Sequence, residues 1–355
     1  MTRRVLYVSA FIPDEHAPHA GGQAAFQNLV DLQREGFEVT LLVCTTERPL
    51  NGQMMSEGVF RQNPVRLMMG WMYALARGFG FGWAAWPLLD TRANIAFERR
   101  LRSELRRDDY ALVFADFTQA LLPVRRASKN LPCRPQLRAC AHDLYVQKLL
   151  RDPGRTSRVL LGAVARIERI LLRSVDDLVT LSAKDAALAT MLYDCRDVRV
   201  KAFVPPRWVA GVCRRSEEIA PREVLFFANF DRPENAEALA WFASNVLPQV
   251  ARHFEDFCLV IAGAGSDRVP VDVNPSIVRR LGFLDDPGPA FSRCRLAIAP
   301  LAQGAGVKFK VLEALACQVP VLATSVALEG VPPGPLVHVA TRADFSAQLT
   351  RLLAE

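Results

Sequence analysis

The sequence predicts an α/β fold made of two Rossmann-like, doubly wound domains. Short apolar strands alternate with amphipathic helices along the chain, a pattern typical of parallel sheets covered by helices. The pattern restarts after Pro205-Pro206, and 355 residues suit two domains of roughly 100–200 residues each. We therefore expect domains at residues 1–204 and 205–355.

The first βαβ unit lies at the start of the chain. Residues 5–9 form a short, β-rich run, residues 24–36 have apolar positions at helical spacing and end in glycine, and residues 37–43 (Phe-Glu-Val-Thr-Leu-Leu-Val) are expected to form a buried strand. This order predicts a parallel sheet with a right-handed crossover. Further elements of this half are expected at strands 110–115, 137–141, 177–182 and 198–204 and at helices 94–107 and 159–172.

The second half repeats the alternation. The predicted strands are 224–228, 257–263, 277–282, 296–300 and 319–324, and the predicted helices are 236–254, 307–316 and 340–353. In doubly wound sheets the ligand binds at the carboxyl ends of the strands, so the loops that follow the strands are the candidates for a site.

Composition excludes several classes of protein. Half of the residues are hydrophobic and 23% are charged, unlike a disordered, collagen-like or disulfide-scaffold protein. The eight cysteines form no Cys-x-x-Cys pair and no cluster with histidine, so we expect free thiols and no zinc site. The start has no signal-peptide pattern, and Arg77 and several glycines interrupt the apolar run 67–89, so we expect a cytoplasmic protein.

Positive charge is concentrated in the first half. Residues 1–203 contain 29 Lys and Arg against 21 Asp and Glu, whereas residues 204–355 contain 15 against 16. One interpretation is a partner with negative charge, such as an anionic lipid or a pyrophosphate-bearing substrate. The other is charge spread over solvated helices. No nucleic-acid recognition motif is present, so we expect no nucleic-acid partner.

The most informative motif follows the predicted strand that ends at Pro300. Gly304-Ala305-Gly306 opens a helix, where unpaired backbone amides favour an anion. Lys308 sits in the first turn, where a cation opposes the helix dipole unless an anion such as a diphosphate compensates it. Glu313 lies further into the helix and could accept hydrogen bonds from ribose hydroxyls. The alternative is a glycine loop that only packs the helix, with Glu313 exposed.

The motifs together resemble the second domain of family 4 glycosyltransferases, the retaining enzymes of the GT-B fold also called glycosyl transferases group 1. The resemblance is carried by Pro233-Glu-Asn-Ala-Glu-Ala-Leu, Leu259-Val-Ile-Ala-Gly-Ala-Gly, Leu281-Gly-Phe-Leu-Asp-Asp, Gly304-Ala-Gly-Val-Lys-Phe-Lys-Val-Leu-Glu-Ala-Leu-Ala and Pro320-Val-Leu-Ala-Thr. In the first half, Gly21-Gly22, His142-Asp143 and Asp177-Leu-Val-Thr-Leu-Ser have counterparts.

The resemblance implies transfer of a sugar from a nucleotide diphosphate-sugar, with no cofactor and no required metal. It also implies that Glu313 is the second glutamate of the family's Glu-x7-Glu motif and binds ribose. Ala305 occupies the position of the first glutamate, a departure that leaves the backbone amides of the glycine loop to contact the donor. Relatives usually continue with a further helix beyond the position of Glu355, so a shortened connection or a truncated end is expected.

The resemblance also assigns candidate site residues. His142 would contact the donor sugar, Asp143 would orient His142 or the acceptor, and Lys308 would stabilise the leaving diphosphate. The segment Leu281-Gly-Phe-Leu would line the base. The implied donor-binding residues are Gly21, Gly22, Arg232, Gly282, Phe283, Gly304, Ala305, Gly306, Val307, Lys308, Phe309 and Glu313. Simpler alternatives stay open: a surface His142, a plain turn at Gly21-Gly22, and Asn235 as the cap of the next helix.

Two segments of the first half are candidates for contact with an anionic membrane. Residues 61–92 combine arginines with Trp71, Trp83, Trp86, Tyr73, Phe79 and Phe81. Residues 151–173 are basic with an apolar face. Aromatic side chains beside arginine suit a membrane interface, and the alternative is that both apolar faces belong to the core.

These observations favour a glycosyltransferase that moves a sugar to a glycan or lipid-linked acceptor in cell-surface polysaccharide synthesis. Two other interpretations stay open. One is a nucleotide-sugar epimerase on the same architecture, and the other is a degenerate glycosyltransferase that acts as a partner subunit, for which Ala305 is the motive.

Overall fold

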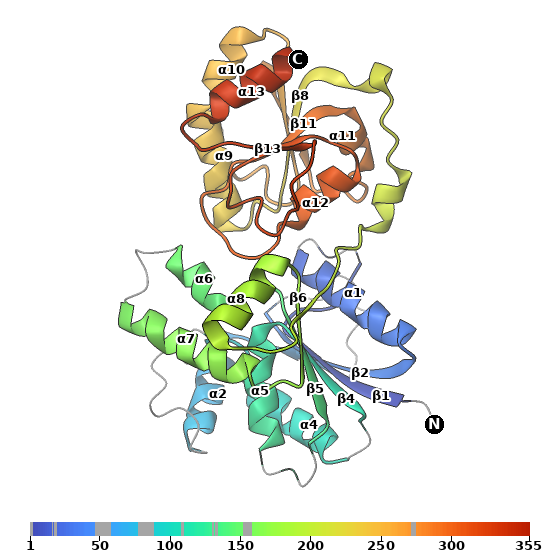
Figure 1. The fold of residues 1–355 in the computed structure, drawn as a ribbon, viewed down its shortest axis with the longest axis vertical. Coiled ribbons are helices and arrows are strands. Elements are labelled where there is room, and N and C mark those ends of the chain that lie inside the picture. Colours follow the sequence, from blue (N-terminus) through green and yellow to red (C-terminus); the bar gives the residue numbers. More distant parts are fainter. Residues whose placement is uncertain are drawn as a thin grey trace. The chain divides into compact units, whose positions relative to one another are not determined.

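The computed structural model describes residues 3–15, 17, 20–46, 58–76, 89–107, 110–129, 131, 134–151, 158–270 and 275–355. They form two compact units, Met1–Ala202 and Phe203–Glu355, each built on its own parallel sheet (Figure 1). The predicted α/β architecture with two parallel sheets is confirmed.

The first unit is built on a seven-stranded sheet in the order β3-β2-β1-β4-β5-β6-β7. Its strands are β1 (Arg3–Ser9), β2 (Phe37–Thr45), β3 (Val59–Arg61), β4 (Leu112–Asp116), β5 (Gln136–Ala141), β6 (Asp177–Thr180) and β7 (Arg199–Val200). The register places Ser9 beside Asp116 and Asp116 beside Cys140. The carboxyl ends of the three central strands therefore meet at one edge of the sheet.

The helices of this unit are α1 (Ala20–Arg34), α2 (Pro64–Ala76), α4 (Ile95–Leu105), α5 (Thr118–Ser128), α6 (Tyr145–Leu150), α7 (Arg158–Leu172) and α8 (Ala183–Tyr193). Helix α1 begins four residues earlier than predicted, so Gly21 and Gly22 lie in its first turn. Helix α7 buries Val164, Ile167 and Leu171 in the core. The described apolar side of α7 thus belongs to the core, which favours the core interpretation for this part of the basic segment 151–173.

The second unit has a six-stranded parallel sheet in the order β10-β9-β8-β11-β12-β13. Its strands are β8 (Ala220–Phe227), β9 (Cys258–Ala262), β10 (Val278–Gly282), β11 (Cys294–Ala299), β12 (Val321–Ala323) and β13 (Val337–Val339). Its helices are α9 (Pro233–Asn245), α10 (Leu247–His253), α11 (Gly288–Arg293), α12 (Phe309–Ala316) and α13 (Phe345–Ala354), with short 3-10 turns at Arg207–Gly211, Ser216–Glu218 and Pro275–Ile277.

The single helix predicted over residues 236–254 is two helices. Helix α9 ends at Asn245, and α10 starts again at Leu247 with Pro248 in its first turn. Proline has no amide hydrogen for the helical ladder and its ring clashes with the preceding turn, so a proline within a helical pattern starts a new helix. The apolar spacing continues across the break, which is why the pattern alone missed it.

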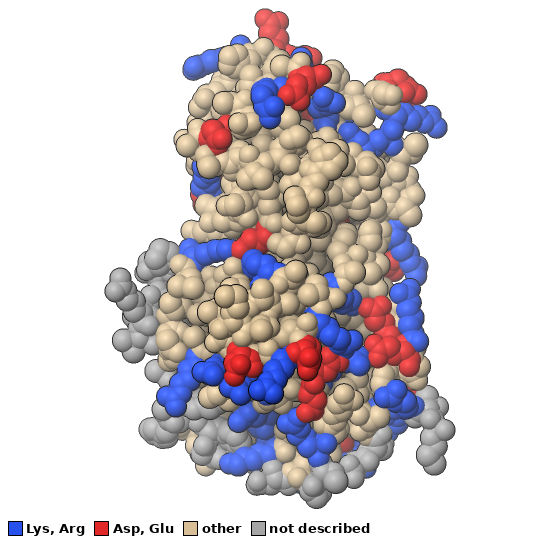
Figure 2. All heavy atoms as spheres, in the orientation of Figure 1, with Lys and Arg blue, Asp and Glu red and all other residues tan. Residues whose placement is uncertain are grey.

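Basic and acidic side chains are paired over much of the first unit. Arg138 contacts both Glu35 and Asp177, Lys201 contacts Asp31, and Arg134 contacts Asp176. On the face drawn in Figure 2, Lys and Arg side chains of this unit are interspersed with Asp and Glu. This pairing favours the interpretation of its charge as solvated surface. Within the described ranges, no helix has the length and apolar character needed to span a bilayer.

A buried ion cluster ties α5 to α4 and to the segment before it. The Arg126 guanidinium binds both carboxylate oxygens of Asp90, at 2.6 and 3.0 Å, and lies 2.5 Å from Glu98 Oε1. All three residues are buried. Burial is the main influence on Glu98 and raises its pKa, although Arg126 opposes the effect. The cluster is satisfied by its own members, so it is a structural support.

We expect Arg126→Met to destabilise the protein by about 3–5 kcal/mol, because two carboxylates would stay buried without their cation. Urea denaturation followed by circular dichroism measures the change. The control is Arg134→Met, which breaks an exposed pair with Asp176 and should cost less than about 1 kcal/mol. Equal effects of the two substitutions would contradict the structural role of the cluster.

Candidate functional site

The glycine loop of the second unit lies between β11 and α12. Gly304 has φ +120° and Gly306 has φ +69°, conformations that side chains with a Cβ atom rarely adopt. Helix α12 follows at Phe309, so its unpaired first amides lie directly after the loop. The predicted strand, glycine loop and helix are all present in this order, and Ala305 and Val307 belong to the same connection.

Lys308 occupies the N-cap position of α12 without a capping hydrogen bond from its side chain, which turns back to the loop. Its ammonium donates to the carbonyls of Gly306, at 2.6 Å, and Ala305, at 3.2 Å. Glu329 Oε2 lies 3.9 Å from the same nitrogen. Lys308 therefore stabilises the loop from within, and its charge is shared between two carbonyls and a carboxylate.

Glu313 is buried, with 5% of its surface exposed. Its carboxylate has no hydrogen-bond partner among the residues that the structure describes. Burial raises its pKa to about 7, and the nearby Lys310 opposes this shift. The alternative of an exposed Glu313 is thus wrong, and the buried carboxylate is available to hydrogen-bond donors of a ligand.

The helix α9 side of this region contains Arg232 and Asn235. Arg232 occupies the N-cap position of α9, and its Nε donates to Glu234 Oε1 at 2.9 Å. Asn235 is not the predicted cap, because it lies three residues into the helix. Its amide nitrogen donates to the Asn229 carbonyl at 2.6 Å, and its oxygen accepts from Lys310 Nζ at 2.6 Å.

The segment predicted to contact the base ends the edge strand β10. Gly282 has φ +69°, and its carbonyl accepts from the Gly263 amide at 2.6 Å. Phe283 follows with 53% of its surface exposed. An exposed aromatic ring after a strand end suits stacking, and contact with a base stays a prediction.

In the first unit, His142 lies directly after β5 and is held by Asp116 at the end of β4. The distance from His142 Nε2 to Asp116 Oδ1 is 2.8 Å. The imidazole also stacks on Phe117, with ring centroids 3.6 Å apart. Burial opposes protonation of His142, but Cys140 and Asp116 outweigh it and raise the pKa of His142 to about 10.

Asp116 is the centre of a buried hydrogen-bond network. Tyr7 donates to its Oδ2 at 2.7 Å, and Asn28 donates to its Oδ1 at 2.9 Å. Lys201 in turn donates to Asn28 at 2.6 Å. Asp116, Cys140 and His142 bring metal-ligand atoms within 4.8 Å of one another, but both Asp116 oxygens already accept hydrogen bonds.

Sequence reasoning assigned the orienting role to Asp143, whereas the residue bonded to His142 is Asp116. The sequence did contain an indication of Asp116, because Asp116 directly follows the predicted strand 110–115 just as His142 follows the predicted strand 137–141. What the sequence did not provide is that β4 and β5 are neighbours. Gly21 and Gly22, in the first turn of α1, belong to the same unit as His142.

We expect Asp116→Asn to lower the pKa of His142, because the negative charge is lost while the burial stays. An NMR titration of the His142 ring measures the change, and Asp143→Asn, the control, should leave the titration unchanged. In the wild type the raised pKa means that protonated His142 contributes its full stability below pH 6.5 and loses it as the pH rises toward about 10. An unshifted titration in Asp116→Asn would contradict the pairing.

Comparisons with known proteins show which family the second half of the chain matches and which fold the chain has. Residues 221–355 match the family model described as glycosyl transferases group 1. An uncharacterized 44.6 kDa protein in the cps region of Klebsiella pneumoniae is 28% identical over 116 residues, a match that spans 30% of this chain and 30% of that protein.

Two solved structures resemble nearly the whole chain. Sucrose-phosphate synthase of Thermosynechococcus elongatus has a TM-score of 0.66 at 14% identity, over 99% of this chain and 90% of that one. Anabaena HepE in complex with UDP and glucose has a TM-score of 0.63 at 15% identity, over 99% and 90%. The chain thus has the GT-B fold of two Rossmann-like domains, as the resemblance implied.

Proposed function

Because residues 221–355 match the glycosyl transferases group 1 and the chain has the GT-B fold, we propose that the protein is a retaining, metal-independent glycosyltransferase. It moves a hexose or related sugar from a nucleotide diphosphate-sugar to a glycan or lipid-linked acceptor of cell-surface polysaccharide synthesis. One observation carries the proposal: Glu313 is a buried carboxylate without a hydrogen-bond donor in the part of the chain that the structure describes, and it follows a glycine loop and two lysines.

The donor fits this region by its chemistry. Ribose hydroxyls supply the hydrogen-bond donors that Glu313 lacks, and a buried acceptor without a donor costs about 1–3 kcal/mol. The amides at the start of α12 suit a phosphate. When the sugar departs, negative charge develops on the diphosphate, and preorganised amides and an ammonium stabilise it. HepE is in complex with UDP, which makes UDP the first nucleotide to test.

His142 is the group that we assign to the donor sugar. It is held rigidly by Asp116 and Phe117, and the raised pKa keeps it protonated and able to donate hydrogen bonds. A fixed donor at a strand end is the arrangement that positions one hydroxyl of a bound sugar. No protein nucleophile is required for attack from the side of the leaving group.

The acceptor side of the proposal rests on α2. Gly70 packs so tightly against Ala93 that a Cβ atom would lie 2.4 Å from its carbonyl oxygen, and Trp71 donates to the Asp90 carbonyl. The opposite side exposes an apolar stripe at helical spacing, formed by Val65, Met68, Met69, Met72 and Leu75. In the described part of residues 61–92, one side of α2 thus packs in the core and the other is exposed and apolar, as a membrane contact requires. Trp83 and Trp86 lie outside the described residues.

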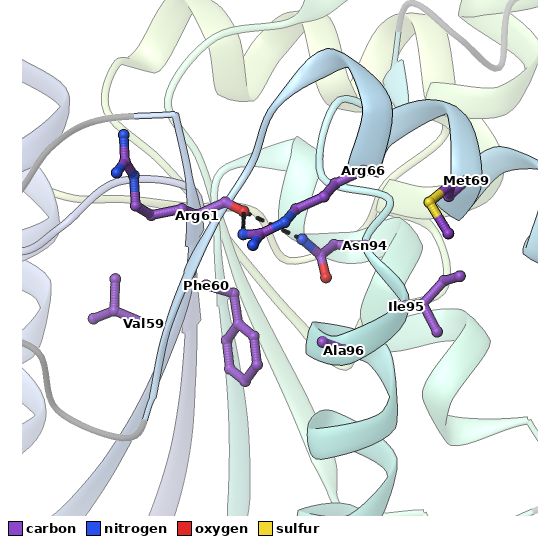
Figure 3. Close-up of a pocket in the computed structure, with 8 residues that line it drawn as sticks. All are labelled: Val59, Phe60, Arg61, Arg66, Met69, Asn94, Ile95 and Ala96. Atoms are coloured by element: carbon purple, nitrogen blue, oxygen red, sulfur yellow. Dashed lines mark hydrogen bonds between the residues drawn. The ribbon is translucent and has the colours of Figure 1, made fainter.

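Basic side chains and a cavity adjoin this stripe. Arg66 donates to the carbonyl of Arg61 at 2.7 Å, at the rim of a cavity of about 560 Å³ (Figure 3). The cavity is lined by Val59, Phe60, Arg61, Arg66, Met69, Asn94, Ile95 and Ala96. An apolar stripe beside arginines suits anionic lipid, so we assign the protein to the inner face of the membrane, where it meets a lipid-linked acceptor.

The proposed activity is tested by a thermal-shift panel of nucleotide diphosphate-sugars in the presence of EDTA. A ligand that binds only the folded protein raises its melting temperature. We expect one donor to shift the transition, with release of its nucleotide coupled to an acceptor-linked product. Release of nucleotide without an acceptor-linked product would favour an epimerase, and no shift with any donor would favour a degenerate partner subunit.

We expect Glu313→Ala to weaken UDP binding by roughly 10–100-fold, because ribose loses its acceptor. Isothermal titration calorimetry measures the affinity. Glu237→Ala is the matched control, since Glu237 lies on the surface of the same unit and pairs with Arg342. If Glu313→Ala binds UDP as the wild type does, Glu313 does not contact ribose.

The α2 stripe is tested by flotation with vesicles that contain phosphatidylglycerol. Met68→Ser with Met72→Ser should reduce the floated fraction several-fold, because the lipid contact loses its apolar side chains. Met191→Ser with Leu192→Ser is the control, since these apolar residues are also exposed, on α8. Equal flotation of both double variants would refute α2 as the contact.

A further inference from the structure

Two helices of the second unit begin at the point where its strand order reverses. From β8 the chain goes to β9 and β10 on one side of the sheet, and from β11 it goes to β12 and β13 on the other. Helices α9 and α12 follow the two central strands, which are neighbours (Figure 1). The connections diverge to opposite faces at such a switch point, which is where open α/β sheets bind their ligands.

A hydrogen bond links the first turns of these two helices. Lys310, in the first turn of α12, donates to the side-chain oxygen of Asn235, in the first turn of α9, at 2.6 Å. Asn235 is buried and is itself fixed by its hydrogen bond to the Asn229 carbonyl. The ammonium is therefore held between the first turns of two helices, where unpaired amides and helix dipoles favour an anion.

The three cationic side chains at the starts of α9 and α12 differ in how their positive charge is balanced by neighbouring groups. Lys308 has two carbonyls and Glu329, and Arg232 has Glu234. Lys310 has a neutral amide oxygen and the face of the Phe226 ring, 5.7 Å away. Of the described residues, Lys310 is thus the cation at the strand ends whose charge is least balanced by its contacts.

We propose that Lys310, oriented by Asn235, is the cation that binds the diphosphate of the nucleotide donor. The inference rests on the proposed function, since it requires that the second unit binds a nucleotide diphosphate. Lys308 then keeps the glycine loop in shape, and Arg232 remains paired at the surface.

The position of Glu313 supports a nucleotide as the ligand. Lys310 and Glu313 are three residues apart on α12 and lie on the same side of the helix, separated by about 4.5 Å along its axis. One group binds phosphate and the other accepts from hydroxyls, which are adjacent parts of one nucleotide. Inorganic phosphate alone would leave Glu313 without its donors.

The surroundings of Lys310 also give the inference a second observable. Burial, with Lys308 and Arg232, lowers the pKa of Lys310 to about 7, and Glu234 and Glu313 act in the opposite direction. Near neutral pH part of the population is therefore unprotonated. A bound diphosphate favours the ammonium, so binding takes up a proton.

Calorimetry of UDP, GDP and their nucleosides tests the inference with three proteins: wild type, Lys310→Met and Arg351→Met. Arg351 lies on the surface of α13 and serves as the control. We expect Lys310→Met to weaken diphosphate binding at least about tenfold and to leave nucleoside binding unchanged. Titrations at pH 7 in two buffers of different ionisation enthalpy should show less proton uptake in Lys310→Met than in the wild type and in Arg351→Met, because Glu313, whose pKa is also about 7, exchanges protons in all three proteins.

The outcomes separate this inference from the proposed function. If the wild type binds UDP or GDP and Lys310→Met binds it equally well with the same proton uptake, Lys310 is not the diphosphate cation, although the proposed function stands. If the wild type binds no nucleotide, both are overturned. Melting temperatures of the three proteins check that each is folded, and Asn235→Ala should show a smaller loss of diphosphate affinity than Lys310→Met.

Discussion

The hydrogen bond between Lys310 and Asn235 is the interaction on which the candidate donor site depends. It joins the first turns of α9 and α12 across the point where the second sheet changes direction. The glycine loop brings α12 to this point, because the turn after β11 requires positive φ angles at Gly304 and Gly306, which glycine adopts readily. The sheet order, the loop and the two helices thus place one ammonium beside the first turns of α9 and α12.

Buried charges in this protein are of two kinds, and the difference separates support from function. Arg126, Asp90 and Glu98 satisfy one another within the protein. Glu313 and Lys310, by contrast, are held so that their charged forms are disfavoured without a ligand. Groups that cost stability in the free protein are typical of binding sites, where a ligand relieves the cost.

The two units share a design at the carboxyl ends of their strands. In the first unit, Asp116 from β4 holds His142 after β5, and in the second, Asn235 after β8 holds Lys310 after β11. In each case a residue from one strand connection fixes a cation from the neighbouring connection. Fixed geometry of this kind reduces the reorganisation that a reaction requires.

Much of the fold could be predicted from the sequence, because apolar strands and amphipathic helices alternate with clear periods. The glycine loop, Lys308 and Glu313 were found in the same way, since they follow one another in the chain. Asp116 and the Lys310–Asn235 contact were not, because each depends on which strands are neighbours. The exposed stripe of α2 was ambiguous because its spacing is also that of a core helix.

The most direct measurement of the central claim is a crystal structure of the full chain with UDP. The account predicts phosphate oxygens about 3 Å from Lys310 Nζ and from the first amides of α12, with both ribose hydroxyls on Glu313. UDP bound away from α12, or bound there with its phosphates on Arg232 and with Lys310 still on Asn235 alone, would contradict it.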